Sequence, residues 1–251
     1  MKPAAALAVA LLALPWAGLD VPSAAQLPAV SREVRQLVTF RFLPGQTRAA
    51  LDLYRAFLVP IYREIEPMHT VRLFAEVESP EPLDLVVVTH YADMAGMDLA
   101  NRLLRQLPGD RPPIGELYRQ VADLSLGHHD QFVEVLSPPA IAAAPDALLE
   151  VLEFLRVSAG AGAGFERQML GVVHPWEQET PLRDILVRSE TARFLVGDGW
   201  DYLRTYAVRD LAAWQAYAAA RARHPAVFAA NRVIEARKTI ILREIPDLRV
   251  R

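Results

Sequence analysis

His90 and Tyr91 are the residues whose types and position best suit them to act on a small molecule. They lie together near the end of an otherwise apolar segment, residues 83–91. An imidazole changes its charge near neutral pH, so His90 could act as a general acid or base beside the phenol of Tyr91. We therefore treat His90 and Tyr91 as candidate catalytic residues. The alternative is a histidine at the edge of the core whose ring binds a carbonyl group.

A second group of histidines, His128 and His129, is followed by Asp130, and residues of these types bind metal ions. Adjacent residues on a strand point to opposite faces, so the two histidines cannot bind one ion in regular extended geometry. A site would need His69 or His90 as further ligands. We therefore expect no metal site, and a polar start to a strand is the simpler interpretation.

Arg204, Tyr206 and Trp214 are the candidate ligand-binding residues, because they belong to an aromatic-rich segment in the second half of the chain. Arg204 and Tyr206 are two residues apart and share one face if the segment is a strand. A guanidinium there could bind a carboxylate, and the aromatic rings could line an apolar pocket. The alternatives are aromatic packing in the core and an ion pair of Arg204 with Asp184 or Glu190.

The composition excludes several classes of protein. The chain has 251 residues, 52% of them hydrophobic, which is enough to form a core, and a net charge of −3. A general nucleic-acid surface needs a clustered basic excess, and the sequence has no such cluster. It also lacks the nucleophile-elbow, P-loop, dinucleotide-binding and His-Glu-x-x-His motifs. We therefore expect no nucleic-acid partner.

The first 25 residues have the pattern of an export signal. Lys2 supplies a positive start, residues 4–14 are apolar, and Ser23 and Ala25 place small residues before a cleavage point at Gln26. The alternative is an uncleaved anchor, but the apolar stretch is short and rich in alanine. We expect a periplasmic or secreted protein with no stable membrane insertion once the signal is removed. Because the chain has no cysteine, it cannot be a disulfide scaffold.

Two segments of the chain, 37–136 and 148–245, look like copies of one unit. Landmarks recur in both in the same order and at nearly constant spacing, which indicates an internal duplication. In pairs, these landmarks are Phe40 and Phe154, Pro67 and Pro181, Tyr91 and Tyr206, and Asp93 and Asp210. We therefore predict a first domain at 26–136, a linker at 137–147 and a second domain at 148–251.

The pattern of each unit predicts the order β-α-β-β-α-β of a ferredoxin-like fold. In the first unit the expected strands are 33–42, 71–78, 83–91 and 131–136, and the expected helical segments are 47–65, 97–107 and 114–126. Pro60 should kink its helix because proline cannot donate the backbone hydrogen bond. The third strand is apolar on both faces, which requires a second sheet packed against it. The fold class is accordingly α+β, with two tandem units packed sheet to sheet.

The segment from Tyr206 through Asp210 to Trp214, with the strand pair before it, resembles the dimeric α/β-barrel superfamily. Within that superfamily it is most similar to the NIPSNAP-like proteins, to which the helix containing His224 and Pro225 is also similar. The resemblance implies two ferredoxin-like sheets packed face to face, here from one chain as a fused pseudo-dimer. Such a chain could be a monomer or associate further as a homo-oligomer.

The resemblance leaves the function open, because one fold can carry many activities. The first hypothesis is an exported protein that binds a small apolar or amphipathic ligand, or a protein partner, without catalysis or a cofactor. The alternative is a cofactor-independent monooxygenase or isomerase that uses His90. A second alternative is haem binding through His174 or His224, each of which precedes a proline. The alignment places Thr205 opposite His90, and we expect any chemistry to lie where the halves differ.

Overall fold

The computed structural model describes four stretches of the chain. They are residues 33–107, 111–137, 149–179 and 182–250. The predicted signal peptide and almost all of the predicted linker lie outside the described residues. The domain boundaries drawn from the sequence therefore remain predictions.

The first half contains β1 (Val34–Phe42), α1 (Thr47–Leu53), a π-helical turn (Tyr54–Leu58), α2 (Val59–Tyr62), β2 (Met68–Glu78), β3 (Leu85–Tyr91), α3 (Met94–Gln106), α4 (Ile114–Asp123) and β4 (Ser125–Val135). The second half contains β5 (Leu149–Val157), α5 (Gly162–Gln168), a π-helical turn (Met169–Val173), α6 (His174–Glu177), a 3₁₀ turn (Leu182–Asp184), β6 (Leu186–Val196), β7 (Tyr202–Val208), α7 (Leu211–Arg221), α8 (Pro225–Asn231), β8 (Ile234–Glu244) and a closing 3₁₀ turn (Pro246–Leu248).

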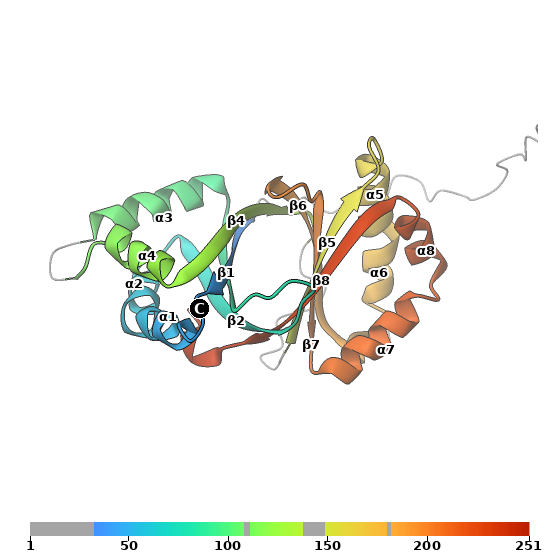
Figure 1. Ribbon diagram of the computed structural model, residues 1–251. Coiled ribbons are helices and arrows are strands. Elements are labelled where there is room, and N and C mark those ends of the chain that lie inside the picture. Colours follow the sequence, from blue (N-terminus) through green and yellow to red (C-terminus); the bar gives the residue numbers. More distant parts are fainter. Residues whose placement is uncertain (1–32, 108–110, 138–148, 180–181, 251) are drawn as a thin grey trace, which may run out of the picture.

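The eight strands form a closed antiparallel barrel in the order β1-β3-β2-β8-β5-β7-β6-β4. The halves join at two seams, where β2 pairs with β8 and β4 pairs with β6. The helices of each half cover its own strands, on opposite sides of the barrel (Figure 1). The predicted fold of two tandem ferredoxin-like units is confirmed, and the edges of the two sheets are hydrogen-bonded into one cylinder.

The strand register defines which residues of the two halves are equivalent. Val34 of β1 pairs with Tyr91 of β3, and Leu149 of β5 pairs with Val208 of β7. The counterpart of Tyr91 is therefore Val208, and its alignment with Tyr206 from the sequence is wrong. The 3₁₀ turn before β6 lengthens the second half and so changes the spacing between equivalent residues. Tyr206, two residues before Val208, is a tyrosine near the expected place and therefore makes the wrong alignment look right.

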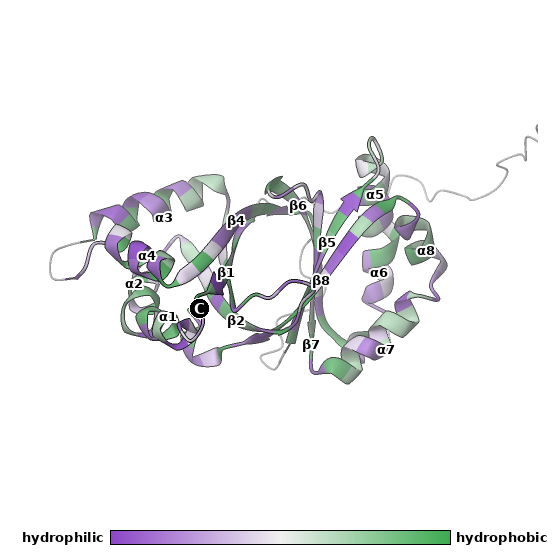
Figure 2. Ribbon diagram, viewed as in Figure 1, coloured by the Kyte–Doolittle hydropathy of each residue, from purple (hydrophilic) through white to green (hydrophobic). Residues whose placement is uncertain are grey.

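The apolar core has one inner and two outer layers. Val86 and Val88 of β3 point into the barrel, whereas Leu85 and Val87 pack against the helices of the first half. The predicted burial of this strand on both faces is therefore confirmed. Equivalent apolar clusters lie between the second sheet and its helices. In Figure 2 hydrophilic and hydrophobic residues share the surfaces of α3 and α4, as expected for helices with one buried face.

Pro60 and Pro175 occupy equivalent places near the start of α2 and α6. Each follows a five-residue π-helical turn, Tyr54–Leu58 in the first half and Met169–Val173 in the second. Proline cannot donate the i→i−4 hydrogen bond, and a π-helical turn is one way in which a helix accommodates that loss. The irregularity expected at Pro60 thus occurs in both halves.

Candidate binding site at the barrel mouth

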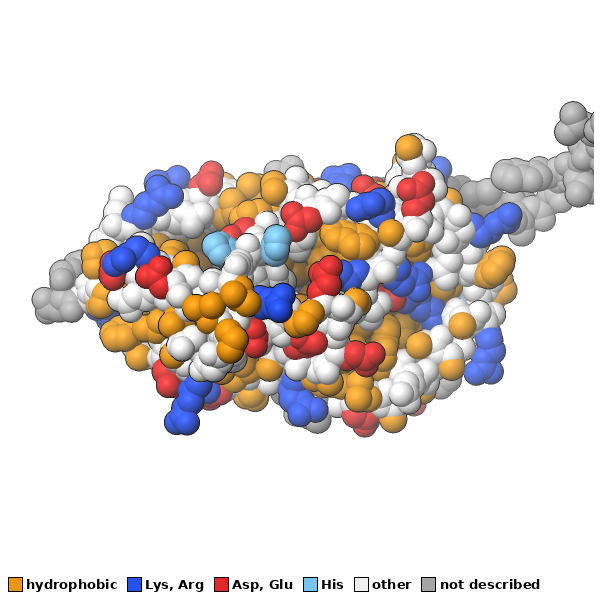
Figure 3. Space-filling model, viewed as in Figure 1, with side chains coloured by type: hydrophobic (Ala, Val, Ile, Leu, Met, Phe, Trp, Pro, Cys, Tyr) orange, Lys and Arg blue, Asp and Glu red, His pale blue; other side chains and the backbone are white. Residues whose placement is uncertain are grey.

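The barrel opens at one end into a cavity of about 790 Å³. Its walls come from β1, β4 and the β2–β3 connection of the first half, and from β5, β8 and the β6–β7 turn of the second. In Figure 3 a hollow between the halves has charged side chains around it. A cavity of this size suits a small molecule, since ligand pockets commonly enclose about 300–1,000 Å³.

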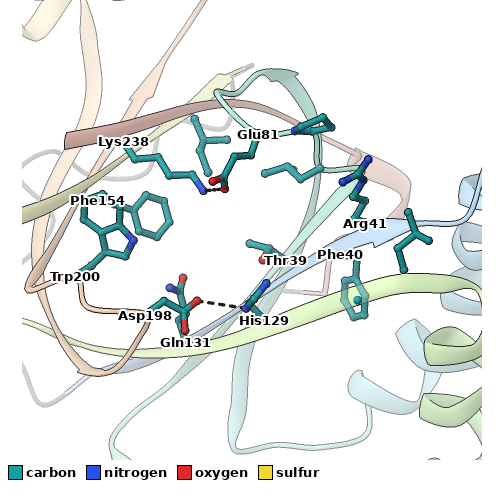
Figure 4. Close-up of a pocket in the computed structure, with 15 residues that line it drawn as sticks. Thr39, Phe40, Arg41, Glu81, His129, Gln131, Phe154, Asp198, Trp200 and Lys238 are labelled. Atoms are coloured by element: carbon teal, nitrogen blue, oxygen red, sulfur yellow. Dashed lines mark hydrogen bonds and ion pairs between the residues drawn. The ribbon is translucent and has the colours of Figure 1, made fainter. Parts of the chain in front are cut away.

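One wall of the cavity is apolar and aromatic. Phe154 of β5 and Ile240 of β8 are 3% and 1% exposed, and both line the cavity. Trp200, from the turn before β7, lies with its ring centroid 6.0 Å from that of Phe154 in a tilted arrangement. The two rings form one end of the cavity in Figure 4 and offer a surface on which a flat ring could pack.

The equivalent strand positions of the first half are polar, although Pro82, Leu83 and Leu126 of that half also line the cavity. By the strand register, Thr39 of β1 corresponds to Phe154, and Gln131 of β4 corresponds to Ile240. Gln131 is only 5% exposed, and its side-chain amide makes no hydrogen bond to any residue that the structure describes. A buried amide at a cavity wall can both donate and accept, so Gln131 is suited to orient a polar group of a ligand.

Two ion pairs cross from one half to the other at the rim. His129 Nδ1 of β4 lies 3.3 Å from Asp198 Oδ2, and Lys238 Nζ of β8 lies 2.5 Å from Glu81 Oε2. The register makes His129 and Lys238 equivalent, and both acidic partners come from the connection between the second and third strands of the opposite half. These carboxylates are largely exposed, so each pair contributes little to stability.

Arg41 adds a positive charge to the mouth. It lines the cavity from the end of β1, and it makes no ion pair with any residue in the described part of the chain. Figure 4 places Arg41 at the end of the cavity opposite Phe154 and Trp200. The cavity therefore has an aromatic end and a cationic end, which is the arrangement expected for an amphipathic ligand with an anionic group.

The β6–β7 turn is fixed by Gly199 and Arg156. Gly199 has φ +74°, a conformation that favours glycine, and its carbonyl accepts a hydrogen bond of 2.7 Å from Arg156 Nε. The guanidinium of Arg156 also lies 5.5 Å from the centre of the Trp200 ring. These contacts place Asp198 and Trp200 at the rim.

His90 lies in the barrel wall outside this cavity and does not act together with Tyr91. Its Nδ1 lies 2.9 Å from Glu33 Oε1. Burial and the positive charge of Arg35 lower the pKa of His90 to about 4, despite that carboxylate. Tyr91 leaves β3 on the other face, is 1% exposed and packs under the helices. The two candidate catalytic side chains therefore do not converge, because consecutive strand residues point to opposite faces.

The register also corrects the comparison made for His90. Its counterpart in the second half is Ala207, whereas the sequence alignment placed Thr205 there. The halves do differ at this position, as expected. His90, however, is surrounded by the charged side chains of Glu33 and Arg35 and does not line the cavity.

The three predicted ligand-binding residues are divided between core and surface. Arg204 and Tyr206 are both 0% exposed. Arg204 Nη2 donates hydrogen bonds of 2.8 and 2.6 Å to the carboxylate of Glu177, and Tyr206 donates one of 3.1 Å to Glu153. Trp214 is half-buried and packs on Tyr206, with ring centroids 5.3 Å apart. These contacts correspond to the two alternatives of aromatic packing and an ion pair, although the acid is Glu177 instead of Asp184 or Glu190.

The histidines considered for haem are enclosed by protein groups. His174 is 4% exposed and its Nδ1 lies 4.0 Å from Glu177, while His224 stacks on Trp176 with ring centroids 4.1 Å apart. Glu177, beside His174, is fully buried and hydrogen-bonded to the equally buried Arg204. A macrocycle beside His174 does not fit this packing.

His128 and His129 lie inside β4 and have different neighbours. His128 stacks on Phe40 and lies 3.4 Å from Asp130, whereas His129 points to the cavity and Asp198. Among the described residues, no group of three or more histidine, aspartate or glutamate side chains is arranged to hold a metal ion. The expected opposite orientation of the two histidines is confirmed.

Sequence reasoning missed most of the cavity residues. Thr39 and Gln131 look like ordinary outward positions of alternating strands, and Phe154 was aligned with the wrong residue of the first half. With the correct strand register, a comparison of the two halves could have located the cavity. Thr39 is polar where the second half has Phe154, and Gln131 is polar where the second half has Ile240.

No protein-family model and no curated protein sequence matches the chain. Solved structures do share its architecture. An anthrone oxidase-like protein superposes with a TM-score of 0.60 at 10% identity, over 86% of this chain and 94% of that chain. A candidate monooxygenase from Lactobacillus acidophilus NCFM gives 0.59 at 7% identity, over 85% and 94%. A chlorite dismutase variant from Candidatus Nitrospira defluvii gives 0.56 at 11% identity, over 89% and 96%.

These identities are too low to carry function from one protein to another, so the likeness concerns the fold alone. It extends over most of each chain, both halves included. The chain therefore has the dimeric α/β-barrel fold, with both ferredoxin-like units supplied by one polypeptide.

Proposed function

We propose that the barrel mouth binds a small amphipathic ligand that carries a flat ring and an anionic or hydrogen-bonding group. The observation that carries the proposal is the contrast between the equivalent walls of the cavity. Phe154 and Ile240 form the apolar side, whereas Thr39 and Gln131 form the polar side. A ligand that matched this contrast would bind in one orientation only.

The aromatic end of the cavity supplies affinity. A ring packed against Phe154 and Trp200 would remove apolar surface from water and gain an aromatic contact of about 0.5–1.5 kcal/mol. The amide of Gln131 and the guanidinium of Arg41 would then meet the polar end of the ligand. The cavity lining includes both charged and polar side chains, so an entirely apolar ligand would leave these groups desolvated without partners.

The proposal concerns binding and does not extend to catalysis. His90 belongs to a buried group of charges, and Tyr91 faces the helices, so neither lines the mouth. A monooxygenase or isomerase that uses His90 with Tyr91 would need both side chains at one ligand. That hypothesis would regain support from turnover that His90→Gln abolishes.

Fluorescence of Trp200 provides the test. The full chain is titrated with 1-naphthoate, which has a flat ring and a carboxylate, and with decanoate, which has the carboxylate but no ring. We expect saturable quenching by 1-naphthoate and weaker binding of decanoate. Calorimetry of the same titration reports binding without relying on the fluorophore.

Matched variants locate the ligand. Trp200→Phe should remove most of the quenching, whereas Trp214→Phe should keep it, because Trp214 lies outside this cavity. Gln131→Leu should weaken 1-naphthoate binding measured by calorimetry. Binding that is unchanged in Gln131→Leu and in Phe154→Ala would place the ligand elsewhere and overturn the proposal.

We also propose that the protein is exported and is a NIPSNAP-like member of its superfamily. The signal pattern of residues 1–25 supports export, and the segment from Tyr206 to Trp214 supports the kinship. Within the described ranges, no helix is long and apolar enough to cross a bilayer. N-terminal sequencing of the protein recovered from a periplasmic fraction tests export, and an intact Met1 there would contradict cleavage.

A further inference from the structure

Four buried charged residues form two ion pairs between the halves, inside the barrel. Arg35 of β1 donates hydrogen bonds of 2.5 and 2.9 Å to Glu190 of β6, and Arg72 of β2 donates one of 2.6 Å to Glu150 of β5. All four are between 3% and 6% exposed. We refer to Arg35, Arg72, Glu150 and Glu190 as the charge belt.

The two pairs of the charge belt are related by the pseudo-twofold symmetry of the barrel. The strand register makes Arg35 equivalent to Glu150, since each follows the first residue pair of its strands. Arg72 and Glu190 are equivalent in the same way in β2 and β6. The symmetry therefore converts each ion pair into the other with its charges exchanged. The first half supplies both arginines, and the second half supplies both glutamates.

This exchange has a direct consequence for the pairing of like halves. In a barrel made from two first halves, Arg35 of each copy would face Arg72 of the other. In a barrel made from two second halves, Glu150 would face Glu190. Arg72 would then lose both of its carboxylate partners, and Arg188 alone would serve two facing glutamates, so each of these barrels would be destabilised.

Neighbouring charges do not cancel this effect. Glu33 lies 2.7 Å from Arg35, Arg188 lies 2.9 Å from Glu150, and Glu244 lies 2.7 Å from Arg72. Glu33 belongs to the first half, while Arg188 and Glu244 belong to the second. Counted with the charge belt, the first half keeps a positive surplus and the second half keeps a negative one.

We propose that the charge belt makes the association of the halves selective, so that each half accepts the other half and rejects a second copy of itself. The inner face of each half-sheet is thus an interaction surface whose partner has complementary buried charge. The selectivity suppresses assemblies of two or more chains in which like halves pair. It is independent of any ligand at the mouth.

Two charge variants separate this role from simple stabilisation. Arg35→Glu with Glu190→Arg keeps both ion pairs of the native barrel, but it gives each half one positive and one negative belt residue. Like halves then become complementary as well. Adding Arg72→Glu and Glu150→Arg inverts all four charges and again makes like halves repel. The four-site variant additionally disturbs Glu244, which contacts Arg72, so the stability of each variant in urea is measured beside its crosslinking.

A disulfide reports the pairing of like first halves. The chain has no native cysteine. In the native barrel Ala75 lies opposite Arg243 and Glu134 lies opposite Arg193, whereas in paired first halves Ala75 would lie opposite Glu134 of the other chain. Ala75→Cys with Glu134→Cys therefore links two chains only when like halves pair. Association through other surfaces does not bring these two positions together.

The experiment unfolds each variant in urea, refolds it at high protein concentration and measures crosslinked two-chain species. We expect at least a fivefold increase for the two-site variant over the four-site variant and the native belt. Arg35→Met with Glu190→Leu removes one pair without reversed charges and should also increase crosslinking, which covers a two-site variant that fails to fold. Equal crosslinking in all folded variants would overturn the proposal.

Discussion

Arg204 and Glu177 form an ion pair that is completely enclosed in the core of the second half. The distance between Arg204 Nη2 and Glu177 Oε2 is 2.6 Å, and neither side chain has any exposed surface. Ser189 donates a further hydrogen bond of 2.8 Å to the carboxylate, and the Tyr217 hydroxyl donates another. An isolated charge in this place would be very costly, so the pair and its donors act as one unit.

Removal of the arginine should therefore destabilise the protein strongly. We expect Arg204→Met to lower the free energy of unfolding by about 3–5 kcal/mol, because the carboxylate of Glu177 stays buried without its partner. Arg204→Met with Glu177→Leu should lose less than the single change. Urea unfolding followed by circular dichroism measures both. A single variant as stable as the native protein would contradict the account of Arg204 as a core residue.

Acid should destabilise the protein through His90. The pKa of His90 is about 4 in the folded state, against an ordinary value of 6.5, because burial and then the charge of Arg35 disfavour the imidazolium. Between these values the unfolded chain binds a proton that the folded chain does not bind, so stability falls as the pH falls from 6.5 to 4. We expect a loss of about 1–3 kcal/mol from this group.

Variants at two histidines check this pH dependence. The difference between the unfolding free energies at pH 7 and pH 4.5 should be smaller in His90→Gln than in the native protein, and replacement of the exposed His69 by Gln serves as the control. The carboxyl of Glu33, with its pKa lowered to about 2, acts in a lower pH range. An unchanged pH dependence in His90→Gln would show that other groups cause the loss.

Gln131→Leu should separate stability from ligand binding. The amide of Gln131 is nearly buried and has no hydrogen-bond partner among the described residues, so its replacement removes a polar group that the fold does not use. We expect the free energy of unfolding to stay within about 0.5 kcal/mol or to rise. Thermal unfolding measures this, and a loss of several kcal/mol would assign Gln131 a structural role.

Gly199→Ala should disturb the rim of the cavity. The backbone there has φ +74°, and an added Cβ would lie 3.1 Å from Arg156 Nη2. We expect a loss of about 1 kcal/mol in stability and a shift in the emission of Trp200, because the turn that carries this ring must move. Gly115→Ala, in α4 with open space around the site, is a matched control. Identical behaviour of the two variants would contradict the account of the turn.

Much of the fold could be predicted from the sequence because periodicity reports burial directly. The apolar third strand indicated a second sheet, and Val86 and Val88 do face the interior shared with the other half. The seams could not be predicted in the same way. Whether β2 pairs with β8 depends on contacts between segments far apart in the chain, which local patterns do not encode.

The site was harder to predict because its residues come from six separate elements. Neither Trp200, in the turn before β7, nor Gln131 of β4 belongs to a recognisable motif. The expectation that Arg204 and Tyr206 share one strand face is correct. The partner of Arg204 is Glu177 of the four-residue helix α6, and the sequence pattern does not predict which side chains this short helix turns toward the sheet. Residues of a catalytic type, such as His90, drew attention to a place where buried charges hold the barrel together.

The exchanged charges of the charge belt also limit how a chain of this kind can evolve. A deletion that removed one half would leave a fragment whose own copies bury like charges against each other, Arg35 against Arg72 or Glu150 against Glu190. Return to a two-chain barrel of identical units would require compensating substitutions in advance. The exchanged charges therefore favour keeping both halves in one chain. The residues that line the cavity can then differ between the halves.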